Sequence, residues 1–353
     1  MPGLLYVPVL PARQHARRAY GLLRPDVRAA LAPLWNLPPC PGVPVAELGP
    51  ANRPELREVR RLHRHHHGWI DAPFAEEQQA AALTEIMAEE TGLAGLLRPV
   101  TGPGRSPAQQ SAALAAARRN GTGLGVRVRL PGEWDSRSAE DVARLLAQTG
   151  GGLPVDLLLD LGEVLPSRPG AGKEALRALD TLWPLAPWRT GAVLGGGFPR
   201  VTAADFPLGA LCRVPRTDWQ TWRELRTSAR PYVPHLTYGD YGIQPARGIA
   251  NRRTRGGIAL SWGVLGYTTD DSFVLCRVVN QGPDRAAAVR GAARMLRGLP
   301  EFRGAAASEG ERWLRDCAAG SLTDKEGTGQ VAVWLRMGNV QHMTHVVQSL
   351  TPP

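Results

Sequence analysis

The feature of this sequence that most constrains its fold is a repeated unit, in which a short apolar run precedes a loop and an amphipathic or Ala/Arg-rich stretch. Short strands that alternate with helices are typical of a parallel sheet, and eight units within about 215 residues match a (βα)8 barrel. A doubly wound open sheet is the alternative, but no GxGxxG motif follows the first run. We therefore predict an α/β fold with a TIM-like barrel. The eight runs expected to form its strands are residues 4–10, 31–37, 68–73, 95–100, 123–130, 155–162, 191–198 and 209–215.

The pattern changes after Pro215. We expect "RTDWQTWRELRTSAR", residues 216–230, to form the last barrel helix, which places the TIM-like barrel in residues 1–230. Residues 231–353 then form a smaller C-terminal α+β region packed on the barrel. Within that region the sequence predicts two strands around a Thr-Asp-Asp turn in residues 256–279, a strand at 330–338, and helices at 284–299, 309–321 and 340–350.

The chain is basic, with a formal net charge of +10, and arginine supplies almost all of the positive charge because Lys173 and Lys325 are the only lysines. This excess is typical of contact with nucleic acid or phosphate. A GC-rich genome is the other explanation, since Gly and Pro are abundant as well. The four cysteines form no CxxC pair, and no stretch has the ~18 to 20 apolar residues of a membrane span. The N-terminus has no signal-peptide pattern, so we expect a cytoplasmic protein without a membrane partner.

Polar residues at the carboxyl ends of the predicted barrel strands are the candidates for chemistry, because barrel enzymes carry their sites at that face. Asp71 and Asp160 interrupt otherwise apolar strands, and Arg127 and Arg129 on a neighbouring strand are natural partners for them. One hypothesis is an ion-pair layer that plugs the barrel mouth. The other is a polar pocket for an anionic or sugar-like group, in which an acid acts as general base and arginines, among them Arg13, bind the substrate.

The stretch "HLTYGDYGIQPA", residues 235–246, has neither helical nor strand periodicity and reads as a tight turn near the top of the barrel. We predict that Asp240, as a third catalytic acid, and Tyr241 cap the pocket; the alternative is that Asp240 binds only the backbone of its own loop. His342 and His345 share a helix face that would form one wall, or they are surface residues. Arg216 completes the predicted substrate-binding set. The "HRHHH" tract at 63–67 has no matching acid or cysteine ligand, so no metal site is predicted, and no cofactor is identified.

Short motifs follow one another along the whole chain. They are "YVPVLPAR" (6–13), "APLWNLPP" (32–39), "WID" (69–71), "PVTG" (99–102), the arginines 127 and 129, "DLLLDLG" (156–162), "GGFP" (196–199), "RTDWQTW" (216–222), "GDYG" (239–242), "GYT" (266–268) and the Gly-x3-His-x2-His run at 338–345. No single motif is specific, but the order in which they occur resembles the beta-protein family of phages and bacteria. Three positions depart from the family pattern: Asn36 stands where an acid is frequent, Gly197 where the family has Ser, and Gly266 where it has Arg.

The resemblance implies an association with phages and bacterial mobile elements but names no reaction. The favoured hypothesis is therefore an interaction protein in phage–host or mobile-element conflict, whose basic surface binds nucleic acid or a partner protein. The alternative is a TIM-barrel enzyme, such as a hydrolase of a phosphate- or sugar-bearing substrate, with its site at the carboxyl face of the barrel. A closed mouth with arginines on an outer face would favour the first. A solvent-lined pocket with converging acids and arginines would favour the second.

Overall fold

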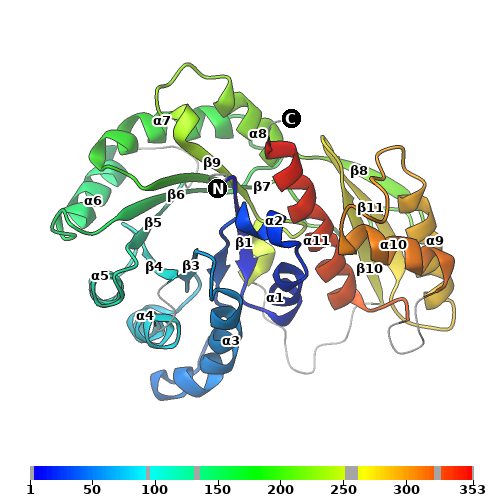
Figure 1. The fold of residues 1–353 in the computed structure, drawn as a ribbon, viewed down its shortest axis with the longest axis horizontal. Helices are drawn as coiled ribbons and strands as arrows, with labels where there is room; N and C mark the ends of the chain where they lie inside the picture. The colour runs from blue at the N-terminus through cyan, green and yellow to red at the C-terminus, as the bar shows by residue number, and fades with distance from the viewer. Residues whose placement is uncertain (1–3, 93–95, 131–135, 251–260, 322–326, 352–353) are drawn as a thin grey trace.

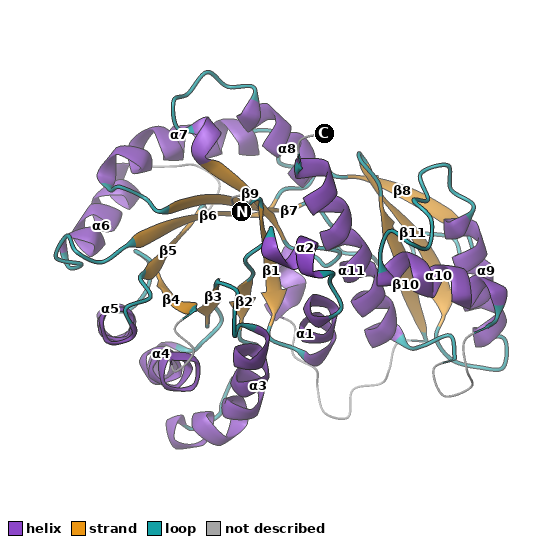
Figure 2. Cartoon of the chain, viewed as in Figure 1, coloured by secondary structure: helices purple, strands orange, loops and turns teal. Residues whose placement is uncertain are grey.

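The chain folds around a closed barrel of eight parallel strands, with helices on its outside (Figures 1 and 2). The computed structural model describes residues 4–92, 96–130, 136–250, 261–321 and 327–351. This barrel confirms the predicted (βα)8 architecture, with its smaller C-terminal α+β part beside it. In order around the barrel, the strands are β1 (Tyr6–Pro11), β2 (Leu34–Asn36), β3 (Gly68–Asp71), β4 (Leu97–Thr101), β5 (Leu124–Arg129), β6 (Val155–Glu163), β7 (Thr190–Gly196) and β9 (Leu236–Asp240).

The eighth barrel strand is not the predicted one. Residues 209–215 contain β8 (Leu211–Pro215), which leaves the barrel and pairs with a strand of the second sheet. β8 is exposed or half-buried along its length, which does not suit a strand covered on both faces, whereas β9 is buried throughout. β9 lies in the stretch predicted to be a turn, and Gly239 explains its unusual sequence. A Cβ at Gly239 would lie 2.7 Å from the carbonyl oxygen of Val7, so only glycine allows the close approach that shuts the barrel.

The helices around the barrel follow the predicted alternation and extend to residue 226, and β9 comes after them. Local signals fix their ends: the hydroxyl of Ser106 accepts a hydrogen bond from the backbone N–H of Gln109, and Gly121 ends the same helix in the left-handed conformation. The α-helices are α1 (Gln14–Gly21), α2 (Pro25–Ala29), α3 (Leu48–Leu62), α4 (Glu77–Gly92), α5 (Pro107–Asn120), α6 (Ser136–Ala147), α7 (Ala171–Leu182) and α8 (Thr217–Arg226). Short 3-10 turns lie at Val45–Glu47, Trp183–Leu185, Val233–His235 and Ala246–Ala250.

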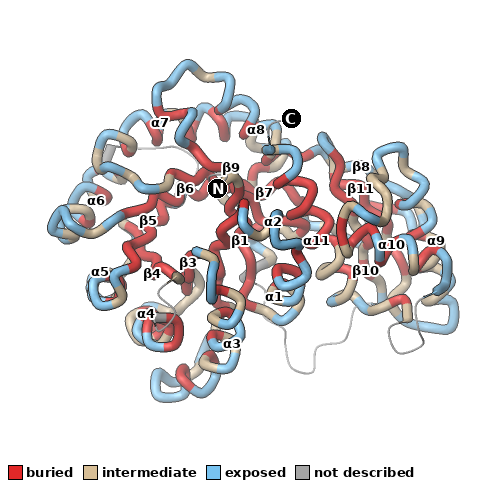
Figure 3. The backbone as a smooth tube through the Cα atoms, viewed as in Figure 1, coloured by how far each residue is buried: buried red, intermediate tan, exposed pale blue. Residues whose placement is uncertain are grey.

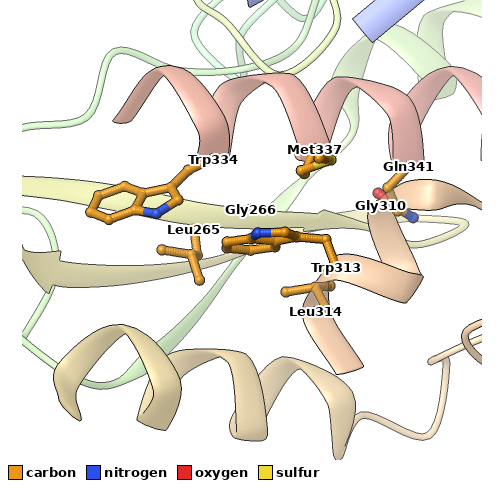
Figure 4. A pocket seen from close by; sticks show the side chains of 9 residues that line it. Leu265, Gly266, Gly310, Trp313, Leu314, Trp334, Met337 and Gln341 are labelled. Carbon is orange, nitrogen blue, oxygen red and sulfur yellow. The ribbon is translucent and has the colours of Figure 1, made fainter. Parts of the chain in front are cut away.

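A second lobe beside the barrel is built on an antiparallel sheet in the order β10 (Trp262–Thr268), β11 (Ser272–Val279), β8. Its helices are α9 (Arg285–Arg297), α10 (Glu309–Ala319) and α11 (Val331–Leu350). The predicted strand at 330–338 is wrong, because these residues form the first half of α11. Trp334 of this half packs on Gly263 of β10, which leaves no room there for a Cβ. The cavity between Trp313, Trp334 and Leu265 has a volume of about 10 Å³, which is enough for one water molecule (Figure 4).

Helix α11 joins the two parts of the molecule. It packs against α1 and β1 of the barrel on one side and against β10 on the other (Figure 1). It therefore occupies the outer position that the eighth barrel helix would take after β9. Most of its second half is buried (Figure 3), with an unbroken buried run from Gly338 to Val347. No helix in the described part of the chain has the length and apolarity that crossing a membrane requires.

Side chains inside the barrel form an apolar middle between two polar layers. Val7, Leu34, Val100 and Leu158 belong to the apolar cluster of the interior. Towards the amino ends of the strands, Asp156 accepts hydrogen bonds from Trp69 Nε1, from Arg98 and from Arg189. These donors stabilise the fold at its buried end, because an unpaired carboxylate there would be strongly unfavourable. The second polar layer lies at the carboxyl ends of the strands and contains the predicted site residues.

Candidate functional site

Arg127 is the centre of the polar layer at the barrel mouth. It is 4% exposed, and its guanidinium donates to Asp71 Oδ2 at 2.8 Å and to Asp160 Oδ2 at 2.8 and 3.0 Å. It also donates to Asn36 Oδ1 at 3.0 Å and to the hydroxyl of Tyr241 at 3.1 Å. These residues come from four different strands and from the end of β9, so the structure does bring together Asp71, Asp160, Arg127 and Tyr241 as the sequence suggested.

The two carboxylates of this layer have further donors. Arg105, from the loop after β4, donates to both oxygens of Asp71 at 2.9 and 3.0 Å. Asp160 Oδ1 accepts from the Tyr241 hydroxyl at 2.6 Å and from the backbone N–H of Gly162 at 2.9 Å. Arg129 lies at the rim with its side chain 51% exposed, 3.6 Å from Asp160 Oδ2 and over the ring of Phe74. All four carboxylate oxygens are therefore engaged by protein donors.

The electrostatics of the layer favour an ionised Asp160. Burial alone would raise the pKa of Asp160, but the charge of Arg127 and the hydrogen bond from Tyr241 outweigh it and lower that pKa. Burial, together with the negative charge of Asp160, raises the pKa of the Tyr241 hydroxyl, so Tyr241 stays a donor. A general base needs a pKa near the working pH and a lone pair that faces the substrate. Asp160 has neither in this arrangement, because its pKa is lowered and both of its oxygens accept hydrogen bonds from protein donors.

Asp240 does not join this layer. It is buried and lies on the outer side of the barrel wall, where Tyr6 donates to Oδ1 at 2.5 Å, and His342 Nε2 and the Tyr238 hydroxyl each lie 2.9 Å from Oδ2. Since β9 ends at Asp240, Asp240 and Tyr241 face opposite sides, and only Tyr241 enters the mouth. Asp240 also accepts from the backbone N–H of Gly242, so it caps its own turn as well as linking β1, β9 and α11.

A second acid extends the Asp240 cluster towards α8. The hydroxyl of Tyr238 contacts Asp218 Oδ2 as well as Asp240, yet it has one hydrogen to donate. Burial raises the pKa of Asp218, whereas attraction to His342 and hydrogen bonds from His342 and Tyr6 overcome burial and lower the pKa of Asp240 to about 2. The Tyr238 hydroxyl therefore lies between two acids whose pKa values are shifted in opposite directions. The predicted site did not include Tyr6 and Arg105, because their carboxylate partners lie on distant segments. It did not include Tyr238 either, whose hydroxyl joins the nearby Asp240 to Asp218 of α8.

The remaining predicted residues lie in other surroundings. Arg216 is fully buried between the rings of Trp219 and Phe273, and its guanidinium lies 3.8 Å from Asp218 Oδ2. His345 lies 3.4 Å from Asp270 Oδ1, and burial lowers its pKa to about 3, so it is neutral. Arg13 lies at the start of α1 and lines a surface groove.

The described part of the chain contains no group of three or more His, Cys, Asp or Glu side chains that could hold a metal ion. The histidine tract shows why: His63 Nε2 accepts from Trp35 Nε1 at 2.7 Å, and Nδ1 lies 2.8 Å from the carbonyl of His66. These partners use both ring nitrogens of His63, and burial lowers its pKa to about 4.

Comparison with known protein families gives a match over almost the whole length. The family model described as beta protein matches residues 6–348. The chain belongs to the beta protein family. Residues of three of the motifs that carried the sequence resemblance lie in the two networks: Asp71 of "WID" lies in the mouth, and Tyr6 of "YVPVL" and His342 of the C-terminal motif meet at Asp240. Gly197 packs against Asp218, where a Cβ would overlap Oδ1.

No curated protein matches this member of the beta protein family. Among solved structures it is similar to the apo crystal structure of a 3-keto-D-glucoside 4-epimerase from E. coli. The alignment has a TM-score of 0.31 and 11% sequence identity, and it covers 70% of this chain and 96% of the epimerase chain.

Proposed function

We propose that this beta protein family member binds nucleic acid through its basic surface and that its barrel mouth is a structural plug. The observation that carries the proposal is the buried guanidinium of Arg127, which neutralises Asp71 and Asp160 together. A hydrolase acting in the mouth would need a carboxylate free to accept a proton from water or substrate. Breaking the plug to free one would leave buried charge without a partner, which is strongly unfavourable.

The molecular surface, unlike the barrel mouth, offers an excess of positive charge for binding. Arginine and lysine number 42 against 32 aspartates and glutamates, and among the described residues the fold buries eight of these acids but three arginines. Guanidinium groups bind phosphate through paired hydrogen bonds, and a positive surface accelerates encounter with a polyanion. The role in phage–host or mobile-element conflict that the sequence resemblance implies forms part of this proposal, with nucleic acid as the bound partner.

A salt titration tests the proposal with the full chain. Fluorescence anisotropy with labelled DNA and RNA strands of about 30 nucleotides would give the dissociation constant between about 50 and 300 mM salt. We expect log K to fall linearly with log salt concentration, since phosphate contacts release counterions. Lack of binding at low salt, or an affinity that does not change with salt, would refute it.

A further inference from the structure

We infer that the groove between α1, α3 and the first turns of α11 holds the phosphodiester backbone of the bound nucleic acid, an inference that rests on the proposed function. Three adjoining cavities of about 610, 490 and 340 Å³ form this groove, and Arg17 lines all three of them. α1 lies between α3 and α11 (Figure 1). The arginines that line the groove are Arg13, Arg17, Arg18, Arg57, Arg61 and Arg336.

The charge of the groove is strongly positive. Six arginines line it, against two acids, Glu55 and Glu58. Glu55 pairs with Arg17, and Glu58 pairs with Arg61 within one helix turn. The side chain of Arg17 is 11% exposed, so its pair with Glu55 belongs to the wall of the groove. The Arg61–Glu58 pair is exposed on both sides, and a pair of this kind contributes little to stability, so a phosphate can compete for the Arg61 guanidinium. Arg18 is exposed on α1.

Two helix ends add to the positive potential. The first residues of α1 and of α11, Gln14 and Val331, both line the 610 Å³ cavity. Neither helix has a side-chain hydrogen bond at its N-cap or an acid in its first turn. The backbone N–H groups of a first helical turn and the helix dipole favour an anion, so both ends reinforce the arginines.

The shape and lining favour a nucleic-acid backbone over other anions. The cavities follow one another along α1 and α3, which suits a chain of phosphates better than a single small anion. None of the residues that line them is Phe, Tyr or Trp, so bases have no ring to stack on. Binding should therefore depend on the number of phosphates and not on base identity. An acidic protein segment is the competing occupant, and the experiment separates the two.

The test compares two doubly charge-reversed proteins. Arg18→Glu with Arg61→Glu alters exposed groove residues, and Arg119→Glu with Arg297→Glu makes the same charge change at exposed positions on α5 and α9, far from the groove (Figure 1). For a single strand, each phosphate contact contributes about 0.7 to the slope of log K against log salt concentration. The loss of two contacts therefore removes a factor of about 25 from the affinity that is gained when salt falls from 1 M to 0.1 M. We expect the double variant of Arg18 and Arg61 to lose at least this much affinity, and the control variant of Arg119 and Arg297 to keep nearly the wild-type affinity. The result should be the same for oligo(dT), oligo(dA) and oligo(rU).

The outcomes separate the groove from the general proposal. If the wild-type chain binds with a salt slope but both double variants weaken it equally, the groove inference fails and the proposed function stands. If the wild-type chain does not bind any oligonucleotide, both fail. If the groove variant loses binding of polyglutamate but keeps that of oligonucleotides, the groove is a protein site and the inference is overturned. Circular dichroism melting of each variant establishes that it is folded.

Discussion

Replacing Arg127 by Met tests whether the barrel mouth is a structural plug. Methionine keeps much of the volume but removes the charge shared by Asp71 and Asp160. Removing one partner of a buried ion pair is destabilising by about 3–5 kcal/mol, because the other charge remains buried. Here Asp71 keeps Arg105, and Asp160 keeps the donors Tyr241 and Gly162. The expected loss is therefore near the lower end, about 3 kcal/mol.

Urea denaturation followed by circular dichroism measures this loss. With an m-value of about 3 kcal/mol/M, the midpoint should fall by about 1 M. The matched control is Arg129→Met, which removes the same side chain from the same strand two residues further on. Arg129 is 51% exposed and 3.6 Å from Asp160, so its loss should change stability by less than about 1 kcal/mol. Equal effects of the two substitutions, or less than about 1 kcal/mol from Arg127→Met, would refute the reasoning.

Two further predictions concern the packing of buried residues. Burial lowers the pKa of His63 from 6.5 to about 4, so on acidification the unfolded chain binds a proton at this residue before the folded chain does. The contribution of neutral His63 to the free energy of unfolding is complete above pH 6.5 and is lost as the pH falls towards 4. His63→Gln keeps an acceptor for Trp35 Nε1 but removes the titrating ring. Urea denaturation at pH 7 and pH 4 should show that the free energy of unfolding declines by about 3 kcal/mol less in this variant than in the wild type. An equal decline in the two proteins would contradict this assignment. At Gly197 a Cβ would overlap Asp218, so Gly197→Ala should lower stability by about 1–3 kcal/mol. Gly152→Ala, where the space is open, should leave the melting temperature nearly unchanged, and equal melting of the two variants would show that Asp218 moves aside freely.

The sequence determined most of the barrel, because seven strands read as apolar runs between helix signals. It failed at β9, where Thr237, Gly239 and Asp240 interrupt the apolar pattern, and at residues 330–338. There the run of Val, Ala, Trp and Leu suits a strand as well as a buried helix. Both errors concern residues whose burial depends on segments far away in the sequence.

The candidate site was predictable only in part. Asp71, Asp160 and Arg127 could be placed together, since the carboxyl ends of neighbouring parallel strands meet at one face. The outward direction of Asp240 follows from the strand register, which requires knowing that residues 236–240 close the barrel. The groove was not predictable, because its third wall, α11, comes from the C-terminal part of the chain and meets α1 only through tertiary packing.

The affinity of the Asp160→Asn variant for a labelled oligonucleotide, measured at a temperature where it is folded, tests the central claim most directly. This substitution keeps the size of the side chain but removes the charge that faces Arg127 in the mouth. If the mouth is a plug and the outer groove binds, the dissociation constant should stay within about twofold of wild type, since a distant site contributes additively. A tenfold or larger change in a folded variant would place the ligand at the mouth and contradict the account.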